Sequence, residues 1–401
     1  MRLRNHLLAL VILIVFLALG SLYVRLWVVQ RPFGIILVVS DGLVSRHITA
    51  ARLYADGADH RLEIEHDFPY SAIVRNDSAQ FAVPDSAAAA TALATGHRAR
   101  HRALGVDGDA HNLTSLLELA RSEGRAVGIV TNGRLTDPTP AAFYAHTASS
   151  ADRDQLAVSL IDAPKFNVLL GGGADDFIPT AQGGRRKDAR NLSEPGGGRE
   201  IVRTKAELEN AAVYRDGTLL GLFASGPLAF SKQRDSGVAQ PALSDLVRRA
   251  IQCLQTNRSG YVLIVDEALV AQAAVVNDGE NAIRETLELD RALDTAVKYA
   301  GEKSLVIAVG RHAIGGFALS GYPLRQDKGP ALLGTTPEGH PAITWASGPK
   351  GPQASEPSAF QTPAALNTAE DVIAIGRGLG AEKVRGFLHQ TDIFRIMKDA
   401  L

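Results

Sequence analysis

Short runs of apolar, often β-branched residues recur along the chain, and stretches with a helical pattern lie between them. The hydrophobicity of these runs is continuous, whereas a strand with one face in water alternates polar and apolar residues. Continuous runs are typical of strands buried on both faces, as in a parallel sheet covered by helices. The alternation therefore predicts an α/β fold with a doubly wound, mostly parallel sheet sandwiched between helices. The runs are Ile35–Val39, Ala126–Val130, Asn167–Leu170, Tyr261–Val265, Ser304–Val309 and Val372–Ile375.

Three helices and two surface loops are expected between these runs. The helices are predicted over Asn112–Ser122, over Ser244–Gln255 with Ser244 as its cap, and over Glu280–Ala300, which has a helical period. The Gly-rich segment 171–200 and the Pro- and Ser-rich segment 348–363 are predicted to be surface loops. We therefore expect one domain with loop insertions.

Charged and polar side chains follow three of the predicted strands. Asp41, Asp266 and His312 each lie just past a strand end. Ligand sites in doubly wound sheets collect at the carboxyl ends of the strands. We therefore expect these three side chains to take part in one site.

The segment Val83–Gly96 holds a single serine, Ser86, that follows Pro-Asp and opens a run of small, helix-favouring residues. A serine at a helix N-terminus lies where free backbone N–H groups and the helix dipole favour a bound anion. Small neighbours leave room for a substrate or metal ions. The alternative is a capping serine on an alanine-rich core helix.

Composition limits the class of protein. The chain has 401 residues, of which 46% are hydrophobic and 21% charged, enough for a large core. Its net charge of −1 gives no indication of a nucleic-acid partner. Because Cys253 is the one cysteine, an intrachain disulfide and a cysteine metal cluster are both excluded. We expect Cys253 to be a buried, inert thiol.

The N-terminus differs from the rest of the chain. Arg2 and Arg4 precede an apolar run, Leu7–Val24, and Trp27 follows it. A run of about 18 residues is at the lower limit for spanning a bilayer, and a cleaved signal peptide would have a shorter apolar core. We predict a signal anchor over residues 1–31 with Trp27 at the membrane interface. The alternative is a cleaved signal peptide.

Several motifs in residues 32–401 resemble those of the alkaline phosphatases and follow in that family's order. The resemblance covers nearly the whole chain after the predicted anchor and implies the fold of that family. It also implies that Ser86 forms a phosphoseryl intermediate beside two zinc ions and a magnesium ion. Besides the serine run, the motifs are Ser40-Asp41-Gly42, Thr49–Tyr54, Leu104–Asp107, Thr139–His146, Leu169–Gly173, Glu370-Asp371-Val372 and Thr391–Phe394.

The resemblance also implies a magnesium site. Asp41 matches the carboxylate that bridges the magnesium and the second zinc, and Asp137 and Thr139 match two residues around the magnesium. Asp266 stands where the family has a glutamate, and it keeps the charge on a shorter side chain. An oxygen-rich set of this kind suits a hard cation such as Mg²⁺, so Mg²⁺ is the expected cofactor. Taken singly, each acid also fits a cap or turn.

The zinc ligands implied by the resemblance are mostly replaced. Ala271, Val275 and Asn367 stand at the three ligand positions of the first zinc; alanine and valine cannot bind zinc, and asparagine binds it poorly. At the second zinc, His312 is kept, but Arg311 stands where the family has an aspartate. Arginine stays protonated and cannot coordinate a metal. We therefore expect the first zinc site to be absent and the second to be half retained.

Two arginines are candidates for binding phosphate. Arg311 changes the local charge by about +2 relative to an aspartate, which offsets the loss of one divalent ion. We hypothesise that it substitutes for the second zinc and contacts a bound phosphoryl group; the alternative is a salt bridge to Asp41 that blocks an empty site. For the family's phosphate-binding arginine, an ungapped match gives Ser150, and a three-residue insertion gives Arg153, which we favour.

These observations predict a phosphate-monoester hydrolase with Ser86 as the nucleophile. The main alternative is a membrane-tethered pseudophosphatase that binds an anion or a partner protein. Hydrolysis of another ester, such as a sulfate or a phosphodiester, is a third alternative. The expected ligand is a phosphorylated small molecule or another anion, a homodimer is possible, and the resemblance places the domain outside the cytoplasmic membrane. His47, His97, His101 and His340 have no ligand-like spacing and are interpreted as surface or structural residues.

Overall fold

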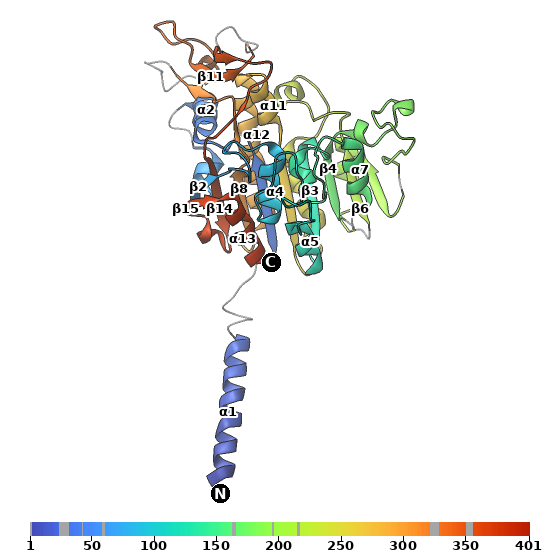
Figure 1. The fold of residues 1–401 in the computed structure, drawn as a ribbon, viewed down its shortest axis with the longest axis vertical. Coiled ribbons are helices and arrows are strands. Elements are labelled where there is room, and N and C mark those ends of the chain that lie inside the picture. Colours follow the sequence, from blue (N-terminus) through green and yellow to red (C-terminus); the bar gives the residue numbers. More distant parts are fainter. Residues whose placement is uncertain are drawn as a thin grey trace.

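The computed structural model of the protein describes residues 2–23, 32–41, 43–57, 61–162, 166–194, 196–214, 217–320, 329–349 and 356–401. A large central sheet carries helices on both faces (Figure 1). In the described part of the chain, its strands lie in the order β15-β2-β14-β8-β1-β7-β3-β4-β6-β5, and only β14 runs antiparallel to its neighbours. The strands are β1 (Gly34–Ser40), β2 (Tyr70–Arg75), β3 (Ala126–Arg134), β4 (Val168–Gly172), β5 (Arg199–Val202), β6 (Thr218–Leu222), β7 (Tyr261–Glu267), β8 (Leu305–Gly310), β14 (Val372–Gly378) and β15 (Gly386–His389).

The central strands are buried on both faces, as the continuous apolar runs predict. In β1, Ile36 and Val38 belong to one hydrophobic core, whereas Ile35 and Leu37 belong to the other. Burying such side chains contributes about 1.5–3 kcal/mol each, so both faces need helices. Each of the six predicted strands is found, and the doubly wound, mostly parallel sheet is confirmed.

Two layers of helices cover the sheet. The first layer packs in the core that contains Ile36, and the second packs in the core that contains Ile35. The first comprises α2 (Ser45–Asp56), α3 (Glu63–His66), α8 (Lys205–Asn210), α10 (Leu243–Leu254), α11 (Leu269–Val275) and α12 (Gly279–Ala300); the second comprises α4 (Ser86–Thr95), α5 (Leu116–Ser122), α6 (Pro138–Ala141), α7 (Arg153–Asp162) and α13 (Gln390–Ala400).

Two predicted helix starts are wrong. The helix expected from Asn112 begins at Leu116, because Ser115 caps it and shares a capping box with Glu118. The helix expected to begin with Ser244 as its cap begins at Leu243 instead, and the Ala242 backbone N–H is satisfied by the carboxylate of Asp245, 3.1 Å away. The helix predicted over Glu280–Ala300 is confirmed as α12.

The predicted loop over residues 171–200 is only partly a surface loop. Asp176 and Arg186 are fully buried within it. The Asp176 carboxylate accepts hydrogen bonds from Arg134 and Thr136, which compensate for its loss of water. The buried Arg186 guanidinium pairs with Asp188 at 2.7 Å. In the second predicted loop, 348–363, residues 350–355 lie outside the described part, and a short strand, β12 (Ser358–Gln361), follows them.

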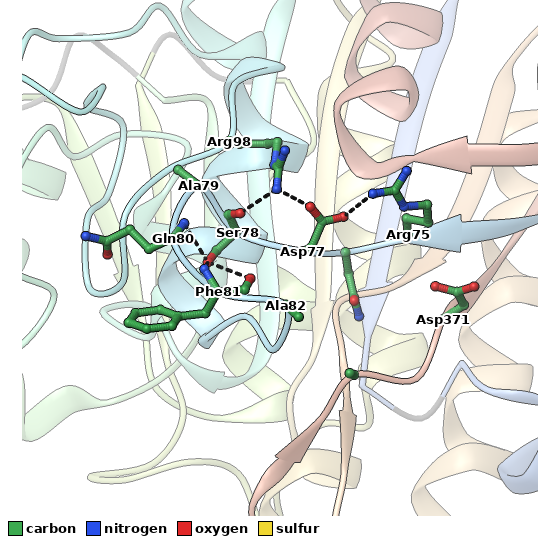
Figure 2. A pocket seen from close by; sticks show the side chains of 11 residues that line it. Arg75, Asp77, Ser78, Ala79, Gln80, Phe81, Ala82, Arg98 and Asp371 are labelled. Atoms are coloured by element: carbon green, nitrogen blue, oxygen red, sulfur yellow. Dashed lines mark hydrogen bonds and ion pairs between the residues drawn. The ribbon is translucent and has the colours of Figure 1, made fainter.

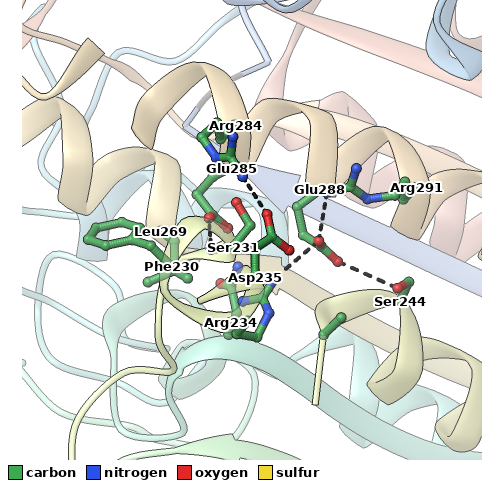
Figure 3. A network of polar contacts seen from close by, with 12 residues as sticks. Phe230, Ser231, Arg234, Asp235, Ser244, Leu269, Arg284, Glu285, Glu288 and Arg291 are labelled. Carbon is green, nitrogen blue, oxygen red and sulfur yellow. Dashed lines mark hydrogen bonds and ion pairs between the residues drawn. The ribbon is translucent and has the colours of Figure 1, made fainter. Parts of the chain in front are cut away.

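A polar network fastens α9 (Ser231–Asp235) to α12 (Figure 3). The Ser231 backbone N–H donates to Glu285 at 2.5 Å, and the Arg234 guanidinium donates to Glu288 at 3.0 Å. Glu285 and Glu288 are buried, so these bonds compensate for the loss of water around their carboxylates. The network holds the segment after β6 against the helical layer that contains α12.

The N-terminal helix, α1 (Arg2–Tyr23), stands apart from the folded domain (Figure 1). Its apolar side chains from Leu7 to Leu19 are exposed. Among the described residues, we find no helix with the length and apolar character needed to cross a membrane. The predicted anchor over 1–31 extends through residues 24–31, including Trp27, which lie outside the described part.

Candidate functional site

Ser86 is the first residue of α4, and it does not cap that helix. The cap is Asp85, whose carboxylate accepts a hydrogen bond from the backbone N–H of Ala88 at 2.8 Å. The prediction that Ser86 lies at a helix N-terminus is therefore confirmed, and the alternative of a capping serine is wrong. The Ser86 hydroxyl instead lies 3.0 Å from Nε2 of His312.

Ser86 opens onto a cavity of about 330 Å³. Three arginines and two carboxylates share the cavity wall with the serine. The guanidinium groups of such a wall can form charge-assisted hydrogen bonds to the oxygens of a phosphoryl group. The charged and nucleophilic residues of the wall are Ser86, Arg134, Asp137, Arg153, Asp266 and Arg311.

The carboxyl ends of three adjacent strands bring these groups together. Asp41 directly follows β1, Asp266 lies near the end of β7, and Arg311 and His312 directly follow β8. The strands are neighbours in the order β8-β1-β7 and run parallel, so their carboxyl ends share one edge of the sheet. The expectation that Asp41, Asp266 and His312 meet at strand ends agrees with this arrangement.

Arg311 pairs with the carboxylate of Asp41 through two hydrogen bonds. Its Nε lies 3.0 Å from Oδ1 and a terminal nitrogen lies 2.5 Å from Oδ2. The other terminal nitrogen donates to the Thr139 hydroxyl oxygen at 2.6 Å. The ion pair is deeply buried, and buried pairs of two-pronged geometry are the strong ones. The salt bridge that we considered as the alternative for Arg311 is therefore present, while Arg311 also lines the cavity of Ser86.

The protonation of the buried groups follows from their surroundings. Burial raises the pKa of Asp266 to about 7; Arg311 and the Thr131 hydroxyl oppose that shift, and Asp137 and Asp41 add to it. Burial also acts to raise the pKa of Asp41, but Arg311 and His312 outweigh it and hold that pKa below its usual value. Burial lowers the pKa of His312 to about 4.

The residues expected to hold Mg²⁺ do not form an open ligand shell. Both oxygens of Asp41 and the hydroxyl of Thr139 already accept hydrogen bonds from Arg311. The carboxylate of Asp137 contacts Arg153 at 3.1 Å and the Arg134 backbone N–H at 2.9 Å. Asp266 accepts a hydrogen bond from Thr131 at 2.8 Å. In this arrangement the guanidinium of Arg311 lies among these oxygens, so the donor set as it stands does not fit a divalent ion.

The positions implied for the first zinc carry no ligand. Ala271 lies on α11 and lines the cavity, and Val275 packs against the core at the end of the same helix. Asn367 lies on β13 (Asn367–Thr368), and its amide donates to the carbonyl of Pro84 at 2.9 Å. Within the described residues, the groups of three or more His, Cys, Asp or Glu with converging ligand atoms are exposed clusters elsewhere, at Glu63 and at Asp107.

Arg153 lines the cavity as the first residue of α7, and it pairs with Asp137 at 3.1 Å. Ser150 does not line the cavity; its backbone N–H donates to the Arg102 carbonyl. Arg134, at the end of β3, is a cavity residue that the sequence analysis missed. Buried Asp176 contacts both arginines, at 3.0 Å to Arg134 and 3.5 Å to Arg153. The strand-end rule applied to β3 could have found Arg134, whereas nothing in the sequence marks Asp176.

The remaining candidates have structural roles. His47 is buried and stacks on Phe317 with ring centroids 4.6 Å apart. Cys253 is buried on α10, as predicted. A larger cavity of about 450 Å³ lies beside β2 (Figure 2), but there both arginines of the wall, Arg75 and Arg98, already pair with Asp77. The cavity of Ser86 is therefore the better candidate site.

Comparisons with known proteins agree with this fold. The sequence model of the family described as alkaline phosphatase matches residues 34–341. The chain is 30% identical to alkaline phosphatase 4 of Bacillus subtilis, over 91% of this chain and 88% of that protein. It is 28% identical to the alkaline phosphatase of Escherichia coli, over 92% of this chain and 86% of that protein.

Solved structures show the same architecture. The crystal structure of Thermus thermophilus alkaline phosphatase matches with a TM-score of 0.75 and 24% identity, covering 93% of this chain and 92% of that one. The alkaline phosphatase of the Antarctic bacterium TAB5 matches with a TM-score of 0.74 and 22% identity, covering 92% of this chain and 98% of that one. The match of the family's sequence model over most of the chain shows that this protein belongs to the alkaline phosphatase family.

Proposed function

We propose that the protein hydrolyses phosphate monoesters through a phosphoseryl intermediate on Ser86. The observation that carries the proposal is the position of the Ser86 hydroxyl at the N-terminus of α4, on a cavity that Arg134, Arg153 and Arg311 also line. The relatives are named alkaline phosphatases, and a serine hydroxyl can act as the nucleophile of covalent catalysis when a partner activates it.

In this proposal the arginines bind and orient the substrate. A guanidinium group recognises phosphate through paired hydrogen bonds and keeps its charge at all relevant pH values. All three arginines line the cavity from different elements. Arg134 lies at the end of β3, Arg153 is the first residue of α7, and Arg311 follows β8. Positive charge placed where negative charge develops in the transition state stabilises that state and so accelerates the reaction.

The second candidate is a pseudophosphatase that binds an anion without turnover. The engaged carboxylates favour it, because Asp41, Asp137 and Thr139 are all bonded to arginines. Without a metal-bound hydroxide, hydrolysis of a phosphoserine lacks its usual nucleophile. A bound phosphorylated small molecule fits both candidates, and Mg²⁺ would need Arg311 to release Asp41 first.

The experiment that separates the candidates is turnover of an aryl phosphate by the full chain, with Ser86→Ala as control. The assay is run with no added metal and with Mg²⁺, Mn²⁺ or Zn²⁺. The proposal predicts turnover and a covalent phosphoryl group on the wild type, and neither on Ser86→Ala. Equal turnover by the wild type and Ser86→Ala under every metal condition would contradict the proposal and favour the pseudophosphatase.

We further propose that the segment 1–31 attaches the domain to a membrane, with residues 32–401 outside the cytoplasm. The support is the sequence itself, with Arg2 and Arg4 before an apolar run. The test is fractionation of cells that produce the chain. A chain that stays in the membrane fraction in alkaline carbonate and is released by detergent would support the proposal, and full release by carbonate would contradict it.

Light scattering of the purified chain measures its mass in solution and so tests whether it forms a homodimer.

A further inference from the structure

The partner of the Ser86 hydroxyl is a buried histidine. His312 is 1% exposed, and its Nε2 lies 3.0 Å from the Ser86 oxygen. The other ring nitrogen, Nδ1, has no hydrogen-bond partner among the described residues and lies 3.9 Å from an oxygen of Asp41. With its proton on Nδ1, the ring presents the lone pair of Nε2 to the hydroxyl. The distance of 3.9 Å to Asp41 is too long for a hydrogen bond, whereas the 3.0 Å contact between the hydroxyl and the imidazole is one through which a base can activate a serine.

The cation beside this pair is an arginine. Arg311 holds both oxygens of Asp41 and the hydroxyl of Thr139, the groups that the family resemblance assigns to metal binding. Its neighbour in the chain, His312, thereby has its ring free to face Ser86. An arginine at position 311, where the family resemblance implies an aspartate, thus accounts for two features. Its guanidinium supplies the positive charge, and the ring of the neighbouring His312 faces Ser86.

We propose that Ser86 and His312 form a nucleophile–base pair, and that the guanidinium of Arg311 replaces the metal ions, so that phosphoryl transfer to Ser86 requires no metal. This inference rests on the proposed function, since it concerns the mechanism of the same phosphoryl transfer. His312 is a catalytic residue in this mechanism because its Nε2 contacts the reacting oxygen.

In the first step, the Ser86 oxygen forms a bond to phosphorus while its proton moves to Nε2 of His312. The bond from phosphorus to the ester oxygen breaks, and the departing alkoxide takes a proton from solvent. In the second step, water attacks phosphorus and releases a proton to solvent. The bond from phosphorus to the Ser86 oxygen breaks, and that oxygen regains its proton from His312. The sum is an ester plus water giving an alcohol plus phosphate.

The second step is expected to be the slower one. In an in-line displacement the attacking water lies opposite Ser86, and therefore away from His312, so this base does not activate the water. The phosphoserine should accumulate after one turnover. Its formation can consequently be measured by intact mass, separately from steady-state turnover.

The test measures the rate of phosphoserine formation from an aryl phosphate on the full chain, after dialysis against EDTA and with metal content determined by elemental analysis. The variants are His312→Gln and, as a matched control, His97→Gln, an exposed histidine after the same helix α4. Calorimetry with inorganic phosphate on each variant shows whether the folded site is kept.

The expected result is an unchanged rate for the metal-free wild type and for His97→Gln. For His312→Gln, we expect a loss of at least ~100-fold, the usual contribution of a general base, with phosphate binding retained. A rate that vanishes in EDTA and returns with Mg²⁺ or Zn²⁺ would overturn the inference but leave the proposed function standing. An undiminished rate for His312→Gln would overturn the role of His312. Absence of phosphoserine under every metal condition would instead contradict the proposed function itself.

Discussion

At the scale of single residues, Arg311 distinguishes this site from the one that the family resemblance implies. Its guanidinium is surrounded by the carboxylate of Asp41 and the hydroxyl of Thr139, and the pair with Asp41 is deeply buried. A buried pair contributes little compared with an apolar alternative, but removing one partner leaves an uncompensated charge. Arg311 therefore affects stability as well as charge at the site.

Substitution Arg311→Ala is expected to destabilise the domain by about 3–5 kcal/mol, because Asp41 would stay buried without its partner. Urea denaturation followed by circular dichroism measures this change. The matched control is Arg395→Ala, which removes an exposed arginine paired with Asp392 and should cost less than about 1 kcal/mol. Equal losses for the two variants would contradict the buried role of Arg311.

Substitution Arg153→Lys is expected to weaken binding of inorganic phosphate about tenfold, because an ammonium group keeps the charge but cannot make the paired hydrogen bonds of a guanidinium. Isothermal calorimetry measures the affinity. Arg185→Lys serves as control, since Arg185 also approaches Asp176 but does not line the cavity. If both variants keep the wild-type affinity, Arg153 does not bind the phosphate.

At the scale of elements, the Glu118–His146 pair joins α5 to the segment after α6. His146 Nε2 lies 3.1 Å from Glu118, and its Nδ1 lies 2.8 Å from the Gly105 carbonyl. The hydrogen bond that His146 donates to the Glu118 carboxylate raises the pKa of His146, although partial burial opposes it. A histidine whose folded pKa is raised stabilises the fold fully below its unfolded pKa, and that stability is lost as the pH rises through the folded pKa.

We therefore expect wild type and His146→Gln to differ more in unfolding free energy at about pH 5.5 than at about pH 9, on either side of the usual histidine pKa of about 6.5. The difference should stay below about 1 kcal/mol, because the pair is partly exposed. Urea denaturation at the two pH values measures it, with the exposed His97→Gln as control. A difference that grows with pH would contradict the sign of this pair's contribution.

The elements with a continuous apolar pattern were predictable from the sequence, and the site only in part. β1, β7 and β8 follow from their hydrophobic runs, and Ser86 at a helix start follows from its neighbours. Helix starts at Leu116 and Leu243 were missed, because side-chain capping by Ser115 and Asp245 decides where these helices begin. The Ser86–His312 hydrogen bond and the burial of Asp176 depend on chain segments far apart in sequence, which local patterns do not encode.

At the scale of the whole molecule, the described part consists of one large sheet with two helical layers, two smaller sheets, and α1 outside the folded domain (Figure 1). The start of the folded domain is fastened by the Arg125 guanidinium, which donates to the carbonyls of Pro32 and Phe33 at 3.0 and 3.1 Å. These hydrogen bonds hold the segment that leads into β1 against the folded domain.

A variant that begins at Pro32 is expected to keep the thermal midpoint and the phosphate affinity of the full chain, because the side chains of α1 from Leu7 to Leu19 are exposed rather than packed. Differential scanning calorimetry and phosphate titration measure both. A further truncation through Phe33 is the comparison, since it removes the ring that meets Tyr261 at 5.9 Å and the carbonyls that Arg125 binds. Destabilisation of the variant that begins at Pro32 would place α1 in the folded domain.

The proposed function requires that Ser86 receives the phosphoryl group in a cavity whose positive charge comes from arginines. The most direct measurement is acid quenching of the full chain during reaction with an aryl phosphate, followed by peptide mapping by mass spectrometry. We expect one phosphoryl group, on the peptide that contains Ser86, and none on the same peptide of Ser86→Ala. A phosphoryl group on another residue, or turnover by wild type that Ser86→Ala retains in full, would contradict it.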